Sequence, residues 1–169
     1  MDFLSGRFRD PGDSQYDFLG SIMVRCPGCE KAARVVRAPD GPGEDGILFG
    51  PLRLVCRGCG MSRVRECRSL GLSFDTARPA TDPYFGLPLW LQTETRHGWL
   101  WAYNLEHLDL IRRFVEASLR ERSYRGGLTL VARLPVWIKQ AKNRDEVLRA
   151  VGRIQASLVA ARPADRRRQ

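Results

Sequence analysis

Apolar and polar residues follow two different periods along this chain. In several short stretches between residues 22 and 103 they alternate at every second position, as in "VRCPGCEKAARVVR" and "LWLQTETRHGWLWAYN", which predicts short β-strands. Beyond residue 104 apolar residues recur every three or four positions, which predicts helices. We therefore expect an α+β fold in which a small three-stranded sheet is followed by a β-hairpin and a helical C-terminal region.

The three strands of the small sheet are expected at Arg34–Arg37, at Leu52–Val55 and in "MSRVREC", residues 61–67. An acidic stretch rich in glycine and proline, residues 38–46, should form a mobile loop between the first two strands. Prolines at positions 79, 83 and 88 oppose helix formation, so residues 69–87 are expected to be a linker.

The hairpin is expected to turn at His97 and Gly98, which would place Glu94 opposite Trp101. One face then carries aromatic side chains and the other carries small or aliphatic ones. The aromatic face holds Trp90, Trp99, Trp101 and Tyr103, and the opposite face holds Leu91, Leu100 and Ala102. Aromatic residues at this period usually belong to a core, and here the following helix is expected to cover them.

A long helix is expected from Leu105 to about residue 122, capped by Asn104. Its buried stripe would be Leu105, Leu108, Ile111, Val115 and Leu119, and its i,i+4 ion pairs would be Asp109–Arg113 and Glu116–Arg120. His107 is expected on its partly exposed surface.

Asn143 and Glu146 resemble the capping box of a second helix, whose buried stripe would be Val147, Val151, Ile154 and Leu158. Pro135 suits the start of a short helix at 136–142, residues 128–134 fit either strand or helix, and the tail at 162–169 is expected to be disordered.

The charge of the chain favours a polyanionic or acidic partner. Of its 169 residues, 28 are Lys or Arg and 19 are Asp or Glu, for a net charge of +9. Most of the excess lies in residues 104–169, with fifteen bases and seven acids, and a smaller share in residues 22–68, with nine and five. Only three bases are lysines, a bias that GC-rich codon usage also produces, so the basicity carries less weight than its size suggests.

The cellular compartment bears on the cysteines. No signal peptide or membrane-spanning apolar run is seen, so a cytoplasmic location is expected. In a reducing compartment, closely paired cysteines indicate metal ligands or redox groups before structural disulfides.

Four cysteines form two Cys-x2-Cys pairs, Cys26 with Cys29 and Cys56 with Cys59, separated by 26 residues. Two such knuckles supply the four thiolates that a tetrahedral Zn²⁺ requires, so we expect one structural zinc ion with no open coordination position. Rubredoxin-like iron or a pair of labile disulfides are the alternatives. Glycines 28, 58 and 60 are expected to supply conformational freedom in the knuckles, and Cys67 is expected to be a small buried side chain.

The "CPGC" and "CRGCG" motifs with their flanking strands resemble the transcription factor IIB-type zinc ribbon, whose members commonly bind nucleic acid or polymerase subunits. The rest of the chain is too short for the helical repeats that accompany this ribbon in initiation factors, and it is similar to uncharacterised bacterial zinc-ribbon-containing proteins. We divide the chain into an N-terminal segment (1–21), the zinc ribbon (22–68), the linker (69–87), the hairpin with helices (88–161) and the tail (162–169).

These patterns predict a non-enzymatic zinc-binding protein that contacts nucleic acid. The phosphate-contacting residues are expected to be Arg34, Arg53, Arg63, Arg65, Lys139, Lys142 and Arg144. Trp99, Trp101 and Tyr103 form a candidate face for base stacking or for docking a partner. The alternative is a protein-interaction adaptor or accessory subunit in which the zinc ribbon is purely structural. No membrane association is expected, because no apolar run is long enough to span a membrane. No small-molecule substrate is expected, because no recognisable catalytic or phosphate-binding motif is present.

Overall fold

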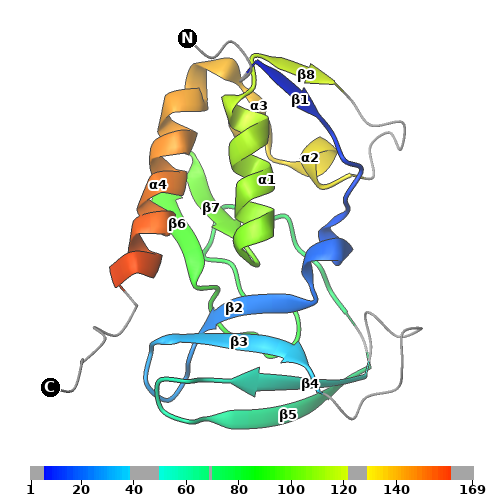
Figure 1. Ribbon diagram of the computed structural model, residues 1–169, viewed down its shortest axis with the longest axis vertical. Helices are drawn as coiled ribbons and strands as arrows, with labels where there is room; N and C mark the ends of the chain where they lie inside the picture. The colour runs from blue at the N-terminus through cyan, green and yellow to red at the C-terminus, as the bar shows by residue number, and fades with distance from the viewer. Residues whose placement is uncertain (1–5, 39–49, 69, 122–128, 161–169) are drawn as a thin grey trace, which may run out of the picture.

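A computed structural model describes residues 6–38, 50–68, 70–121 and 129–160. It has an α+β fold, in which three small sheets and a set of helices enclose one continuous core (Figure 1). The acidic loop and the C-terminal tail that the sequence predicts lie largely or wholly outside the described residues. None of the described helices is long and apolar enough to cross a membrane.

The sheet that carries the cysteine pairs has four antiparallel strands in the order β2-β3-β4-β5, rather than the expected three. Its strands are β2 (Ser21–Arg25), β3 (Ala32–Arg37), β4 (Gly50–Val55) and β5 (Ser62–Cys67). The unexpected strand β2 precedes the first knuckle, and its Ile22 and Val24 are fully buried. We call this unit the cysteine sheet.

The hairpin β6 (Leu91–Thr95) and β7 (Gly98–Ala102) turns at residues 96–97, one position earlier than expected. Glu94 therefore lies opposite Trp99 instead of Trp101. The prediction of the turn was wrong because the Thr95 hydroxyl holds it, accepting from the N–H of His97 and donating to the carbonyl of Gly98. Each strand residue changes its partner by two positions, so the division into an aromatic and an aliphatic face survives.

Helix α1 (Leu105–Glu116) begins as expected, because the side chain of Asn104 accepts a hydrogen bond from the N–H of His107. It ends earlier than expected. Leu119–Glu121 form strand β8, which pairs in parallel with β1 (Arg7–Arg9), so Leu119 is exposed instead of joining a helical stripe. Leu105 is likewise exposed, whereas Leu108, Ile111 and Val115 are buried as predicted.

The ion pairs on α1 follow the prediction only in part. Arg113 pairs with Asp109 at 2.9 Å, as expected. Glu116 pairs instead with Arg112, because the chain leaves the helix before Arg120. The guanidinium of Arg120 lies 4.3 Å from the centre of the Phe114 ring.

The C-terminal elements are α2 (Leu130–Arg133), α3 (Val136–Lys139), the 3-10 turn η4 (Ala141–Asn143) and α4 (Arg144–Ala160). Residues 130–133 are thus helical. The predicted capping box does not form: Glu146 pairs with Arg96 of the hairpin turn, and Asn143 donates to the carbonyl of Trp137. Helices α1 and α4 lie side by side across the hairpin, with α4 against β6 (Figure 1).

The cysteine sheet is joined to the rest of the molecule through strand β2. The N–H of Met23 donates to the carbonyl of Tyr103 at 2.7 Å, and the carbonyl of Met23 accepts from the N–H of Trp90 at 2.9 Å. Asn104 adds donations from its side chain to the carbonyls of Phe18, in the turn η1 (Gln15–Phe18), and Ser21. These bonds place the sheet at one end of the molecule, opposite β1 and β8 (Figure 1).

Candidate metal centre

The four paired cysteines lie within reach of one metal ion. The sulfur atoms of Cys26 and Cys59 are 3.7 Å apart, those of Cys29 and Cys56 are 3.6 Å apart, and the Sγ atoms all lie within 4.8 Å of one another. Tetrahedral coordination with metal–sulfur bonds of about 2.3 Å requires sulfurs about 3.8 Å apart, whereas a disulfide requires about 2.05 Å. The spacing therefore suits a single metal site of the zinc type, with all four positions taken by protein.

The two knuckles repeat the same backbone geometry. In the first, the N–H of Cys26 donates to the carbonyl of Lys31, and the N–H of Glu30 donates to the carbonyl of Cys26. In the second knuckle, the N–H of Cys56 donates to the carbonyl of Met61, and the N–H of Gly60 donates to the carbonyl of Cys56. The fourth residue after each leading cysteine has a positive φ, 58° at Glu30 and 75° at Gly60. Each cysteine pair is therefore held by its own turn.

Of the knuckle glycines, only Gly60 needs its conformational freedom, because Gly28 and Gly58 do not have positive φ angles. Those two positions lack room instead. A Cβ at position 28 would lie 2.7 Å from the Cε of Met61, and a Cβ at position 58 would lie 3.0 Å from the Cδ of Lys31. The residue that closes each knuckle thus covers the glycine of the other knuckle.

The clustered thiols do not ionise alike. Burial raises the pKa of Cys26, but hydrogen bonds from the N–H groups of Gly28 and Cys29 and from neighbouring thiols outweigh it and bring the pKa to about 7. The N–H of Lys31 lowers the pKa of Cys29, but burial and the neighbouring thiols raise it by more, so the pKa reaches about 12. Four thiolates at this separation need a cation to neutralise them. Cys67 is buried, as expected, and is not one of the four.

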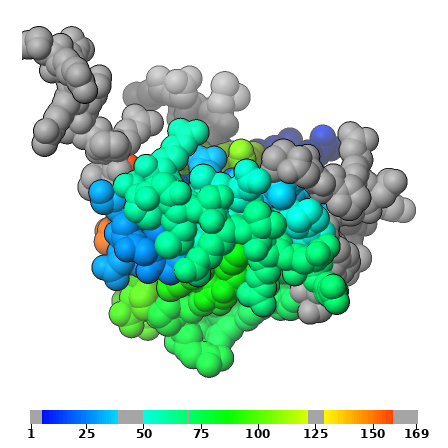
Figure 2. Space-filling view, turned by 90° about the horizontal axis from the view of Figure 1, so that it is seen from below, coloured from blue at the N-terminus to red at the C-terminus, as the bar shows by residue number. Residues whose placement is uncertain are grey.

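The arginines of the cysteine sheet lie on both sides of its edge strand β5. The register puts Arg34 and Arg53 on the outer face, with Val64 beside Arg53. Arg63 and Arg65 point to the opposite face, where their neighbours on β4 are Leu54 and Leu52. Figure 2 looks onto this end of the molecule, where β4 and β5 occupy much of the surface, with β2 beside them.

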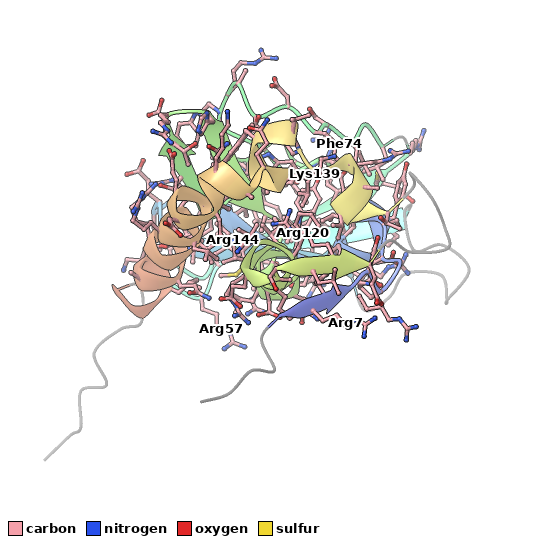
Figure 3. All side chains as sticks on the ribbon, turned by 90° about the horizontal axis from the view of Figure 1, so that it is seen from above. Arg7, Arg57, Phe74, Arg120, Lys139 and Arg144 are labelled. Carbon is pink, nitrogen blue, oxygen red and sulfur yellow. The ribbon has the colours of Figure 1, made fainter. Side chains whose placement is uncertain are left out.

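The predicted bases of the helical region lie elsewhere. Lys139 donates from Nζ to the carbonyl of Ala132, and Arg144 donates to the carbonyl of Ala117 at the end of α1. Lys139 ends α3 and Arg144 begins α4, at the end of the molecule opposite the cysteine sheet (Figure 1). Figure 3 looks onto this end and labels both residues. Lys142 is exposed in the neighbouring turn η4. The seven predicted phosphate contacts therefore do not form one continuous face.

The aromatic face of the hairpin is largely covered, though not by α1 alone. Tyr103 is buried, and its hydroxyl accepts a hydrogen bond from Gln15. The N–H of Trp99 donates to the carbonyl of Thr76, and the indole of Trp101 donates to the carbonyl of Asp75. Residues 72–76, the crossing segment, thus lie against this face. Trp90, Trp99 and Trp101 are half-buried, so these three rings of the face retain partly exposed surface.

Two polar residues are buried beside this face. The sequence pattern predicted one of them, His107, to lie on the surface, and it gave no sign of the other, Gln15. His107 is only 2% exposed rather than lying on the surface, and burial lowers its pKa to about 3. Gln15 is 3% exposed and bridges the crossing segment to Tyr103. No local pattern marks either residue, because their burial depends on contacts between distant segments.

Comparison with protein-family models, with curated proteins and with solved structures finds no match for this chain. Its class therefore follows from its own geometry: an α+β protein with a closed four-cysteine metal centre at one end.

Proposed function

We propose that this protein is a non-enzymatic zinc-ribbon protein that contacts the phosphate backbone of nucleic acid through the arginines of its cysteine sheet. Zinc is the ion that suits four thiolates in tetrahedral geometry, and its role is structural because no coordination position is left for a substrate. A cytoplasmic location accords with reduced thiols.

The observation that carries the proposal is that four arginines of the cysteine sheet form no ion pair with any described carboxylate. Arg34, Arg53, Arg63 and Arg65 take part in none of the ion pairs seen among the described residues, whereas arginines of β1, α1 and the hairpin turn are paired with carboxylates. Residues 21–68 carry nine bases and five acids. Four thiolates with one Zn²⁺ contribute about −2, so this segment keeps a small net positive charge of about +2. Arginines around one strand that form no ion pair within the described residues suit phosphate contacts that do not depend on base sequence.

The proposal is narrower than the sequence prediction, because it leaves out Lys139, Lys142 and Arg144. Two of these side chains donate to main-chain carbonyls that end helices. Contacts of this kind complement the partial negative charge of a helix C-terminus, so these bases stabilise the fold.

The test is a fluorescence anisotropy titration of labelled single- and double-stranded DNA and RNA at several salt concentrations. The double variant Arg34→Gln/Arg63→Gln should weaken binding and reduce the slope of log affinity against log salt by about two. The matched double variant Arg9→Gln/Lys142→Gln removes the same charge at the other end and should leave affinity nearly unchanged. Absence of binding at low salt, or an equal loss in both variants, would overturn the proposal.

The surface of β5 supports a second candidate, a protein-interaction adaptor. Val64 is 59% exposed on this edge strand, beside half-buried Val55 and Arg53. An apolar side chain among arginines suits a protein surface better than a phosphate backbone. Capture of a partner that survives nuclease and high salt, and is lost in Val64→Ser but not in Arg34→Gln/Arg63→Gln, would favour the adaptor.

A further inference from the structure

Strand β5 forms an open edge of the cysteine sheet. It is the last strand in the order β2-β3-β4-β5, and no other described strand pairs with its outer side (Figure 1). Residues 62–66 are all exposed, and β5 lies on the surface that Figure 2 shows. An open edge of this kind presents main-chain donors and acceptors to which another strand can bind.

The register fixes which main-chain groups point to that open side. In antiparallel strands the N–H and C=O of one residue point to the same side, and this side alternates along the strand. The carbonyl of Pro51 accepts from the N–H of Ala38, which follows β3, so the main-chain groups of Glu66, the partner of Pro51, point away from β4. The N–H of Cys56 donates to the carbonyl of Met61, which gives the same alternation from the other end of the pair. The residues whose N–H and C=O groups face the open side are therefore Ser62, Val64 and Glu66.

The side chains of β5 alternate between the two faces of the sheet. Val64 lies on the outer face and is 59% exposed. Arg63 and Arg65 lie on the other face, each at the open end of a cross-strand row that continues into a buried leucine of β4. Burial raises the pKa of Asp82 and the charge of Arg65 lowers it in part, yet among the described residues neither arginine forms an ion pair. The edge therefore presents an apolar side chain between two positive charges.

These charges decide which strand the edge accepts. A second copy of β5, paired in antiparallel register about Val64, would set Arg63 of each copy opposite Arg65 of the other. Like charges directly opposite each other are destabilising, so the arginines oppose self-pairing. A strand with carboxylates opposite the two arginines and an apolar residue between them would instead form two ion pairs and cover Val64.

We propose that β5 binds an acidic extended segment of a partner protein, which adds one more antiparallel strand to the cysteine sheet. Acidic residues of that segment meet Arg63 and Arg65, the apolar residue between them packs on Val64, and the main-chain bonds form with residues 62, 64 and 66. The inference goes beyond the proposed contact with nucleic acid and does not rest on it, because it requires the main-chain edge as well as the charges.

The test uses the zinc-bound full chain and the synthetic peptide acetyl-Thr-Glu-Val-Glu-Thr-amide, which has this pattern. Isothermal titration calorimetry should show saturable one-to-one binding. N-methylation of the central valine removes an N–H that faces β5, so it should weaken binding at least about tenfold. N-methylation of both glutamates alters N–H groups that face away from β5, so the affinity should stay within about threefold. Replacing both glutamates by glutamine should weaken binding and remove most of its salt dependence.

Amide hydrogen exchange followed by NMR gives a signature that charge attraction alone does not produce. The peptide should protect the amides of Ser62, Val64 and Glu66, which face the open edge. The amides of Arg63 and Arg65 face β4 and should change little. Absence of saturable binding at millimolar peptide, or binding without this alternation, would overturn the proposal.

A pair of variants at position 64 gives the last arm of the test. Val64→Pro removes the outward N–H and leaves the ladder to β4 in place, since proline is tolerated on edge strands. It should weaken peptide binding at least about tenfold, whereas Val64→Thr keeps the N–H and should bind within a few-fold of wild type. Stoichiometric zinc shows that both variants fold.

Neither variant changes charge, so nucleic-acid affinity should be equal in both, and this result separates the inference from the proposed function. Equal peptide affinity of Val64→Pro and Val64→Thr would overturn the inference. So would alternating protection in concentrated protein without peptide, because it would assign the edge to a second copy of the chain.

Discussion

Gly28 of the first knuckle lies directly beneath the terminal methyl group of Met61 in the second: a Cβ at position 28 would be 2.7 Å from Met61 Cε. The reciprocal contact joins Gly58 to Lys31 at 3.0 Å. A side chain of each knuckle therefore packs on the glycine of the other, and a substitution in one knuckle is expected to disturb the packing of both. This interlocking explains why both pairs use glycine between their cysteines.

Gly28→Ala should destabilise the zinc-bound protein by about 1 kcal/mol, because Met61 must turn away from the added methyl group. Chemical denaturation in the presence of zinc measures this cost. In a Met61→Ala background the same substitution should cost close to nothing, since the obstructing methyl is gone. Equal costs in both backgrounds would show that the contact does not matter. Gly152→Ala, in the open middle of α4, is the control and should stabilise by about 0.5 to 1 kcal/mol.

Glu30→Gly should stabilise the protein by up to about 1 kcal/mol. Glu30 has a φ of 58°, a conformation that costs residues with a Cβ about 1 to 2 kcal/mol, of which glycine's extra unfolded-state entropy offsets a part. Glu30→Gln separates this effect from charge, because it keeps the Cβ and removes only the carboxylate. A gain in the free energy of unfolding that is as large for Gln as for Gly would assign the effect to charge near the thiolates.

Removal of the metal with a chelator should release one zinc ion per chain and lower the unfolding temperature markedly. The knuckles hold β3 to β2 and β5 to β4, and without a cation the four thiols have no common partner. Amide hydrogen exchange should accelerate most in β4 and β5, which lie farthest from the helices (Figure 1). Cys56→Ser should reproduce the loss, whereas Cys67→Ser should retain stoichiometric zinc.

His107→Phe should change how stability depends on pH. The folded-state pKa of His107 is lowered to about 3 by burial, while the unfolded value is about 6.5, so the unfolded chain binds the extra proton. The wild type therefore loses up to about 1.4 kcal/mol per pH unit below pH 6.5, and the variant does not. Since both proteins keep the zinc ligands, the difference in their free energies of unfolding between pH 7 and pH 5 isolates this group. A difference that is constant with pH would contradict the assignment.

Asn104→Ala should destabilise the protein by about 2 to 3 kcal/mol. The residue caps α1 through the N–H of His107 and donates to the carbonyls of Phe18 and Ser21, so three hydrogen bonds are lost together. Asn104→Ser keeps a capping oxygen and should lose only the part that anchors the segment before β2. Thermal or denaturant unfolding distinguishes the two, and equal losses would mean that the cap contributes nothing and that only the bonds to Phe18 and Ser21 matter.

The local patterns of the sequence succeeded where a short stretch determines its own geometry. The Cys-x2-Cys spacing predicts the four ligands, since each knuckle closes within six residues, and the Asn104 cap and the buried residues of α4 follow from helical periodicity. The predictions failed where a distant segment decides. Strand β2 exists because Tyr103 and Trp90 bond its free edge, and residues 119–121 leave the helical pattern to pair with β1.

The sequence by itself thus determined the metal centre, the α+β class and most element positions, because those depend on bonding between near neighbours. Only the tertiary structure decided that the helix bases lie apart from the arginines of the cysteine sheet, that His107 is buried, and that Gln15 is buried between the crossing segment and Tyr103. Burial and hydrogen-bond satisfaction are properties of packed segments far apart in the chain, so no local pattern carries them.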